Sequence, residues 1–247
     1  MNHDQIASFF ARHERICFQF SAGKDSAAVL WLLESYWSQM DVVWMNPGDC
    51  YPETYTYMQR MAKMLPRFRS VLGAQHEDIK LHGHPVDIVP LSMTAKGRSI
   101  TSRPGLLVRP YTECCWNNMW KPMQDFVMRG GYSGVIRGQK LYDRMKNPLP
   151  SGVIVNDVEY FYPIDDWTDQ RVFDFLGEDR VPPSYKRGLK SSLDCMSCTA
   201  YTHENPGRLA DLRGISTTAW KTVTTVHLAL LDALAEESEA IRNCHGE

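Results

Sequence analysis

Four cysteines carry the clearest chemical signal in this chain. Cys114 and Cys115 are adjacent, and Cys195 and Cys198 form a C-x-x-C pair that begins eighty positions after the first pair (195 − 115 = 80). Four thiolates that meet at one point need a counter-charge, which a tetrahedral Zn²⁺ or an iron–sulfur cluster supplies. The sequence therefore predicts a metal centre held by these four cysteines.

The spacing within the first pair bears on the kind of metal. Structural zinc sites mostly use two C-x-x-C pairs, a geometry that adjacent cysteines do not readily reproduce. Neighbouring cysteines reach two irons of a cubane more readily than one small ion. A 4Fe-4S cluster is therefore favoured, and a zinc site and buried cysteines without a metal remain as alternatives.

A second signal is a short polar loop with the sequence Ser21-Ala22-Gly23-Lys24-Asp25-Ser26. Its small residues let the backbone approach an anion closely, and the helix that follows would point its first N–H groups at a phosphate. Lys24 adds a mobile positive charge, and Asp25 is placed to position Mg²⁺ or a hydroxyl group. The loop is not a Walker A motif. An ordinary strand-to-helix turn with a polar cap is the structural alternative.

The elements around these residues alternate between strand and helix. Strands are expected at residues 16–20, 41–45, 86–91 and 134–137, and helices at residues 26–37, from 52 onward, at 116–129, 168–176 and 217–242. Thr168 is suited to cap its helix, and residues 96–109 are expected to form an irregular basic loop. Alternating strands and helices predict an α/β fold with a mainly parallel sheet covered by helices on both faces.

The loop resembles the S-G-G-K-D-S signature of the PP-loop ATP pyrophosphatase superfamily, with Ala22 in place of the first glycine. Further stretches resemble, in family order, the phosphoadenosine phosphosulfate (PAPS) reductase family within it. They are Pro52-Glu53-Thr54-Tyr55, Arg137-Gly138-Gln139 with Asp143-Arg144, Pro163-Ile164-Asp165-Asp166-Trp167-Thr168, and Val181-Pro182-Pro183-Ser184-Tyr185 ahead of Cys195-Met196-Ser197-Cys198-Thr199. The resemblance covers about residues 16–200.

The resemblance implies a single α/β domain of the adenine nucleotide alpha hydrolase-like, PP-loop type, with an irregular cysteine-bearing C-terminal region. Its expected limits are residues 1–214, followed by a C-terminal helix and tail at residues 215–247. The loop Ser21, Ala22, Gly23, Lys24, Asp25 and Ser26 would hold a phosphate or phosphosulfate, and Arg137 and Arg144 would neutralise its charge. The cysteine arrangement also resembles the ligand set of the 4Fe-4S adenylylsulfate (APS) reductases.

The implied activity is the reduction of a sulfonucleotide to sulfite with release of AMP or PAP. The reductases carry a nucleophilic cysteine in a C-terminal Glu-Cys-Gly-Leu-His motif, whereas this chain ends Asn243-Cys244-His245-Gly246-Glu247. Cys244 is the candidate for that nucleophile. Thioredoxin or glutathione would then release the sulfite.

Lys24 favours a second possible function. The sulfonucleotide reductases usually lack a lysine in this loop, whereas the ATP-cleaving PP-loop enzymes keep it. The alternative is therefore an ATP-dependent sulfurtransferase that acts on nucleic acid, with Lys24 as a catalytic residue. A third reading is a non-catalytic nucleotide-binding protein.

Composition excludes some classes of function. The net charge of −2 over 247 residues argues against a broad nucleic-acid footprint. No apolar run approaches the roughly 20 residues of a membrane span, and residues 1–15 lack a signal-peptide core. A cytoplasmic protein with no membrane contact is expected. The oligomeric state, and the choice among APS, PAPS and ATP, are left open.

Overall fold

The computed structural model describes residues 3–102, 104–141, 143, 150–189, 194–203 and 207–246. Their contacts divide the chain into two compact units. Unit 1 comprises residues 1–46, 50–72 and 122–194, and unit 2 comprises residues 47–49, 73–121 and 195–247. Each unit is therefore assembled from segments that lie far apart in the sequence. The expected domain limits at residues 214 and 215 stay a prediction.

Unit 1 is built on a six-stranded sheet with the order β3-β2-β1-β6-β8-β7. The strands are β1 (Ile16–Gln19), β2 (Met40–Asn46), β3 (Phe68–Leu72), β6 (Gly134–Ile136), β7 (Val153–Val155) and β8 (Val158–Phe161). All neighbouring pairs are parallel except β7 and β8, which are antiparallel. The predicted α/β fold with a mainly parallel sheet is confirmed.

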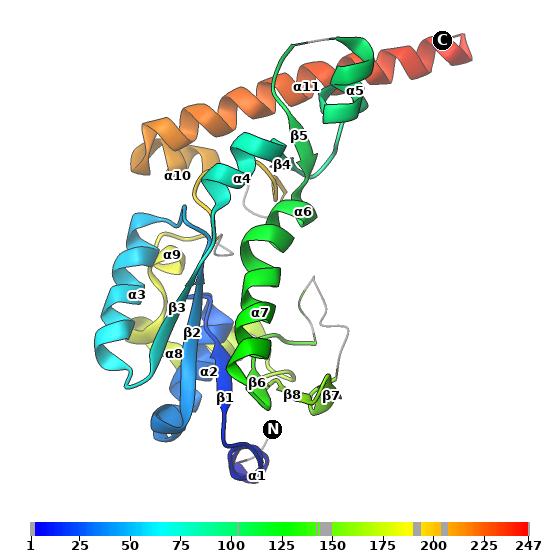
Figure 1. Cartoon of the computed structure of the whole chain (residues 1–247). Coiled ribbons are helices and arrows are strands. Elements are labelled where there is room, and N and C mark those ends of the chain that lie inside the picture. Colours follow the sequence, from blue (N-terminus) through cyan, green and yellow to red (C-terminus); the bar gives the residue numbers. More distant parts are fainter. Residues whose placement is uncertain are drawn as a thin grey trace. The chain divides into compact units, whose positions relative to one another are not determined.

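Helices cover both faces of this sheet. Figure 1 shows α7 crossing in front of the strands and α2 and α8 behind them. The helices of unit 1 are α1 (His3–Arg12), α2 (Lys24–Leu32), the 3₁₀ turn η1 (Glu34–Gln39), α3 (Pro52–Met64), α7 (Lys121–Gly130), α8 (Asp169–Arg180) and α9 (Pro183–Lys186). Parallel neighbouring strands need crossover connections, and helices in these connections pack back onto the sheet.

The strand order reverses direction between β1 and β6. The chain runs outward from β1 to β2 and β3 and later returns to pair β6 with the free side of β1. Ligands of open parallel sheets bind outside the carboxyl ends of the strands at such a switch point. The loop after β1 and the segment after β6 therefore occupy the favoured place for a ligand in unit 1.

Continuous apolar sequence explains the centre of unit 1. In β1 and β2 only Gln19 and Asn46, at the carboxyl ends, are not fully buried. Strands buried on both faces require such unbroken runs. The helix α2 packs a buried stretch of small and branched residues from Ala27 to Leu30 into the same core. The predicted strands at 16–20 and 41–45 and the predicted helix after the loop are confirmed within a few residues at their ends.

Unit 2 surrounds a smaller, two-stranded parallel sheet. Its elements are α4 (Gln75–His82), β4 (His84–Val86), the 3₁₀ turn η2 (Leu91–Met93), α5 (Ala95–Thr101), β5 (Val108–Pro110), α6 (Tyr111–Cys115), the π-helical turn η3 (Trp116–Trp120), α10 (Arg208–Ile215) and α11 (Thr217–His245). A small apolar core of Val86, Met93, Val108 and Val226 joins β4 and β5 to the long helix α11.

Two expectations from the sequence are wrong in detail. The strand expected at 86–91 is the shorter β4, which pairs with β5 and not with the main sheet. The loop expected at 96–109 contains helix α5 and the start of β5. Gly97 explains the helix, because its missing side chain lets α5 lie against the Leu91 carbonyl, where a Cβ would clash.

None of the helices within the described residues combines the length and apolar character that a membrane crossing requires.

Candidate functional site

The loop after β1 is folded by its own short-range polar contacts. The backbone N–H of Gly23 donates to Ser21 Oγ at 3.3 Å, and the Ser26 hydroxyl lies 3.1 Å from that same oxygen and donates to the Gly23 carbonyl at 3.0 Å. Ala22 adopts a left-handed conformation with φ of 61°, which explains why related signatures place glycine there. The predicted loop residues are therefore gathered at the start of α2.

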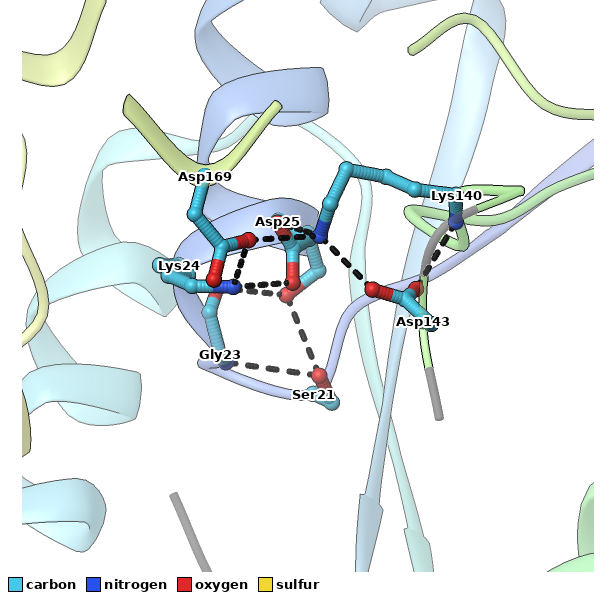
Figure 2. A network of polar contacts seen from close by, with 8 residues as sticks. Ser21, Gly23, Lys24, Asp25, Lys140, Asp143 and Asp169 are labelled. Carbon is cyan, nitrogen blue, oxygen red and sulfur yellow. Dashed lines mark hydrogen bonds and ion pairs between the residues drawn. The ribbon is translucent and has the colours of Figure 1, made fainter. Parts of the chain in front are cut away.

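Two buried lysines converge on the loop (Figure 2). Lys24 Nζ lies 2.8 Å from Asp25 Oδ2 and 2.9 Å from Asp169 Oδ1. Lys140 Nζ lies 2.5 Å from Asp25 Oδ1, 2.8 Å from Asp143 Oδ1 and 3.2 Å from Asp169 Oδ1. These five side chains form the charged network of unit 1.

The sheet topology brings the members of this network together. Lys24 and Asp25 follow β1, Lys140 and Asp143 follow β6, and Asp169 begins the helix after β8. The strands β1, β6 and β8 are adjacent and parallel, so their carboxyl ends lie along one edge of the sheet. The predicted cap also serves this arrangement, because Thr168 Oγ1 accepts from the Arg171 N–H and fixes the start of α8.

Gly138 allows the segment after β6 to lie against the loop. A Cβ at this position would come within 2.6 Å of the Ser26 nitrogen. The neighbouring Arg137 donates from Nε to Gln19 Oε1 at 2.7 Å and stacks over the Tyr160 ring at 5.1 Å. The predicted anion-binding residue Arg137 is thus held at the carboxyl ends of β1 and β6. Its predicted companion Arg144 lies outside the described residues.

The network changes the proton affinities of its members. Burial alone would raise the pKa of Asp169, but hydrogen bonds from Lys24 and Lys140 outweigh it and lower that pKa. Burial alone would lower the pKa of Lys140, but hydrogen bonds to Asp143 and Asp25 raise it. Lys140 and the Asp169 carboxylate therefore both stay charged at neutral pH.

The four predicted cysteines line one pocket in unit 2. They are Cys114 and Cys115 from α6 and Cys195 and Cys198 from the loop before α10, joined by Gln75, Pro85, Tyr111, Asn118 and Met119. The prediction that the two distant pairs meet is therefore supported by their positions. Within the described residues, no group of three or more His, Cys, Asp or Glu side chains has the geometry of a metal site.

An amide side chain contacts Cys114, the first cysteine of the adjacent pair. Asn118, which is buried in η3, donates from Nδ2 to the Cys114 carbonyl at 3.0 Å and points the same nitrogen at Cys114 Sγ at 3.8 Å. Asp78 accepts from Asn118 at 2.6 Å and also pairs with the buried Arg109. Burial would raise the pKa of Asp78, but its hydrogen bonds from Arg109, Asn117 and Asn118 outweigh this and lower it. A permanently charged pair thus supports the Cys114 side of the pocket.

The second cysteine pair lies in a loop held mainly through its backbone. Asp49 accepts from the Met196 N–H with its carbonyl at 2.6 Å and from the Ser197 N–H with Oδ2 at 2.7 Å. Arg208, buried in α10, donates to the carbonyl oxygens of Met196, Cys198 and Ala200 at 3.1, 2.6 and 3.4 Å. The C-x-x-C loop is therefore held through its backbone by Asp49 and Arg208.

The donor set suits a thiophilic centre. Burial raises the pKa of the Cys114 thiol to about 11, so a thiolate there needs a cation beside it. Gln75 lines the same pocket, and its buried Oε1 has no hydrogen-bond partner among the described residues. Four soft sulfur atoms around one space are the type of ligand that a thiophilic metal would use.

The remaining cysteines lie elsewhere. Cys17 is fully buried in β1, as a core residue would be. Cys244 is exposed in the last turn of α11, which continues as helix to His245. It lies 17 residues beyond His227 (244 − 227 = 17), whose ring contacts the Thr199 carbonyl next to Cys198. At 1.5 Å per residue, Cys244 is about 25 Å along the helix from that contact.

Residues 15–89, which contain the loop, match the family model described as phosphoadenosine phosphosulfate reductase domain. The family predicted from the motifs is thereby confirmed over this segment. A solved structure of phosphoadenylyl-sulfate (PAPS) reductase from Candida auris, a phosphate complex, is similar to the chain at 17% identity and a TM-score of 0.49. The match covers 72% of this chain and 80% of that chain. A comparison with curated proteins found no match.

Sequence reasoning missed the residues that support both sites. Asp143 was predicted only as part of a motif, without a role, and Asp169 was not predicted. Both follow strands, β6 and β8, that lie in the same parallel group as β1. The sequence around Asp49 gives no hint of its role, since its partner Ser197 is 148 positions away. Arg208 and Asn118 bind mainly backbone groups or a distant carboxylate, which no sequence motif records.

Proposed function

We propose that this chain is an adenine-nucleotide-dependent enzyme of sulfur metabolism that reduces a sulfonucleotide, APS or PAPS, to sulfite. AMP or PAP is the second product. The observation that carries the proposal is the convergence of two cysteine pairs, eighty positions apart, on one pocket of a chain whose residues 15–89 match the reductase family.

The nucleotide site of the proposal is the loop Ser21–Ser26 at the switch point of the sheet. The start of α2 favours an anion there, because its first N–H groups are not used within the helix. Lys24 and Arg137 supply positive charge on two neighbouring strand ends. Mg²⁺ would be bound together with a nucleotide, with Asp25 as a candidate ligand.

The cofactor of the proposal is a 4Fe-4S cluster held by Cys114, Cys115, Cys195 and Cys198. When bound, it would supply positive charge to the thiolates and cross-link the two cysteine segments. Asn118 would direct an amide N–H at the Cys114 sulfur, and Arg208 would keep the C-x-x-C loop in place through Cys198.

The chemical step of the proposal uses Cys244. Its thiolate would form a bond to the sulfonyl sulfur while the sulfur–oxygen bond to AMP or PAP breaks. A thiol of thioredoxin or glutathione would then attack the Cys244 sulfur. That attack forms a disulfide, and sulfite leaves with the electron pair. The exposure of Cys244 at the end of α11 suits an encounter with such a partner.

Anaerobic purification with a visible spectrum and iron and sulfide counting tests the cofactor. About four irons and four sulfides per chain are expected. Cys195→Ser should lose iron and colour, whereas Cys50→Ser, a partly exposed cysteine outside the pocket, should keep both. A colourless, iron-free protein with one zinc per chain would overturn the cluster.

The second candidate function is an ATP-dependent sulfurtransferase that acts on nucleic acid. The observation that favours it is Lys24, which is buried at the loop and paired with Asp25 and Asp169. The two functions differ in their products. Thiol-dependent release of sulfite from APS or PAPS selects the reductase, and release of pyrophosphate from ATP selects the sulfurtransferase. Tight nucleotide binding with neither product leaves a non-catalytic binding protein.

A further inference from the structure

One exposed carboxylate lies between the two buried lysines of unit 1. Asp169 Oδ1 is 2.9 Å from Lys24 Nζ and 3.2 Å from Lys140 Nζ, and Figure 2 shows it reaching both ammonium groups. The side chains of Lys24 and Lys140 are 9% and 1% exposed, whereas that of Asp169 is 65% exposed. A single oxygen held by two ammonium groups is the arrangement that a phosphate or sulfate oxygen would adopt.

The charges of the network do not balance. Two lysines face three carboxylates, those of Asp25, Asp143 and Asp169, so the five side chains carry one net negative charge (2 − 3 = −1). An incoming anion would meet repulsion in this state. If the Asp169 side chain turned away from the two lysines, the remaining four side chains would have no net charge. The positive end of the α2 dipole would then favour a bound anion.

Of the three carboxylates, that of Asp169 can move away from the lysines most readily. The side chains of Asp25 and Asp143 are 23% and 29% exposed, less than half as much as that of Asp169. Exposed ion pairs contribute little because solvent screens them. Asp169 is also the first residue of α8, so its side chain can turn toward solvent without disturbing the helix.

We propose that Lys24 and Lys140 form a subsite for the outer oxyanion of the bound nucleotide, a phosphoryl or sulfuryl group, and that this group displaces Asp169. The subsite rests on the proposed function, because the nucleotide must lie at the loop Ser21–Ser26. Lys140 is then a binding residue that contacts substrate, and Asp169 is a competing carboxylate that lowers affinity for the outer group.

Equilibrium binding of ATP, APS and AMP to the full chain tests the subsite. Asp169→Asn should bind ATP or APS about tenfold more tightly than the unsubstituted chain, the effect of removing one screened charge at contact distance. The affinity for AMP, which lacks an outer group, should stay unchanged. The matched control is Asp174→Asn, which removes an exposed charge from the same helix and contacts Gln170 instead of the lysines.

A second comparison separates the two sources of the oxyanion. A higher affinity of Asp169→Asn for ATP assigns the subsite to a phosphoryl group. A higher affinity for APS assigns it to a sulfuryl group. Adding Lys140→Met to Asp169→Asn should abolish the gain, whereas adding Lys63→Met, an exposed lysine of α3, should preserve it. Circular dichroism checks that each variant is folded.

The failure of the subsite is distinguishable from the failure of the proposed function. If the unsubstituted chain binds ATP or APS but Asp169→Asn binds neither more tightly, the subsite is overturned and the nucleotide site stands. If Asp169→Asn and Asp174→Asn raise affinity equally, the effect is general charge and the subsite is likewise overturned. If no adenine nucleotide binds the unsubstituted chain, the proposed function itself fails.

Discussion

The guanidinium of Arg208 donates to the backbone carbonyl of Cys198 at 2.6 Å, so a buried cation of α10 holds one pocket cysteine through its main chain. The same side chain reaches the carbonyls of Met196 and Ala200. These hydrogen bonds hold the loop through its backbone carbonyl oxygens. Arg208 therefore positions the C-x-x-C loop through backbone oxygens.

Arg208→Met should destabilise the chain by about 2–4 kcal/mol, because three buried carbonyl oxygens lose a charged donor. Urea unfolding followed by circular dichroism measures the loss. Arg208→Lys should recover only part of the stability, since one ammonium group cannot reproduce the planar fork of a guanidinium. Arg213→Met is the control, because Arg213 is exposed on the same helix and stacks on Trp220. An equal loss in both variants would contradict a special role for Arg208.

Asn118→Leu should destabilise unit 2 by about 2–3 kcal/mol, because Asp78 and the Cys114 carbonyl both lose a buried donor. If a metal centre is bound, the same change should also make it more easily lost, measured as iron released to a chelator over time. The matched control is Asn117→Leu, since Asn117 is exposed and donates to Asp78 without contacting Cys114. Faster iron release from both variants would assign the effect to Asp78 alone.

The sequence predicted the residues of both sites better than their surroundings. The loop Ser21–Ser26 and its flanking strand and helix were predictable because each is encoded within a few neighbouring residues. The meeting of the two cysteine pairs was predictable because two closely spaced pairs, among the seven cysteines of the chain, suggest a common ligand. The supporting contacts of Asp49 and Arg208 were not, because they join residues distant in sequence or bind backbone atoms that every residue carries.

Burial explains which strands the sequence revealed. The strand β3 was missed because none of its residues is fully buried, so Phe68–Leu72 shows no apolar pattern. It is an edge strand, and its backbone pairing with β2 defines it although its composition does not predict a strand. The strands β1 and β2 were found because the middle of a parallel sheet requires unbroken apolar sequence.

The buried carboxylate of Asp41 predicts a pH dependence of stability. It accepts hydrogen bonds from Tyr132 at 2.7 Å and from Arg67 at 3.0 Å. Burial would raise the pKa of Asp41, but these bonds outweigh it and lower the pKa below its ordinary 3.8. A lowered folded pKa gives stability that is fully present above 3.8 and is lost as the pH falls through the folded value.

Asp41→Asn should therefore cost about 2–3 kcal/mol near neutral pH, because Arg67 loses its buried partner. The difference from the unsubstituted chain should shrink on acidification, since the natural carboxylate becomes protonated and loses its advantage. Urea unfolding between about pH 7 and about pH 3 measures both effects. Asp174→Asn, a change at an exposed carboxylate, should show no such trend. A constant difference across this range would refute the role of Asp41.

Cys244→Ser tests the chemical step of the proposed function. Cys244 is exposed on the last turn of α11, where a serine of nearly equal size should leave the free energy of unfolding unchanged within about 0.5 kcal/mol. Sulfite release from APS or PAPS should fall at least about a thousandfold, because a hydroxyl cannot replace the thiolate nucleophile. Nucleotide affinity should be unaffected, since the loop Ser21–Ser26 is untouched. The control Cys50→Ser should keep full activity, and sulfite production by Cys244→Ser at the natural rate would remove Cys244 from the mechanism and strengthen the sulfurtransferase reading.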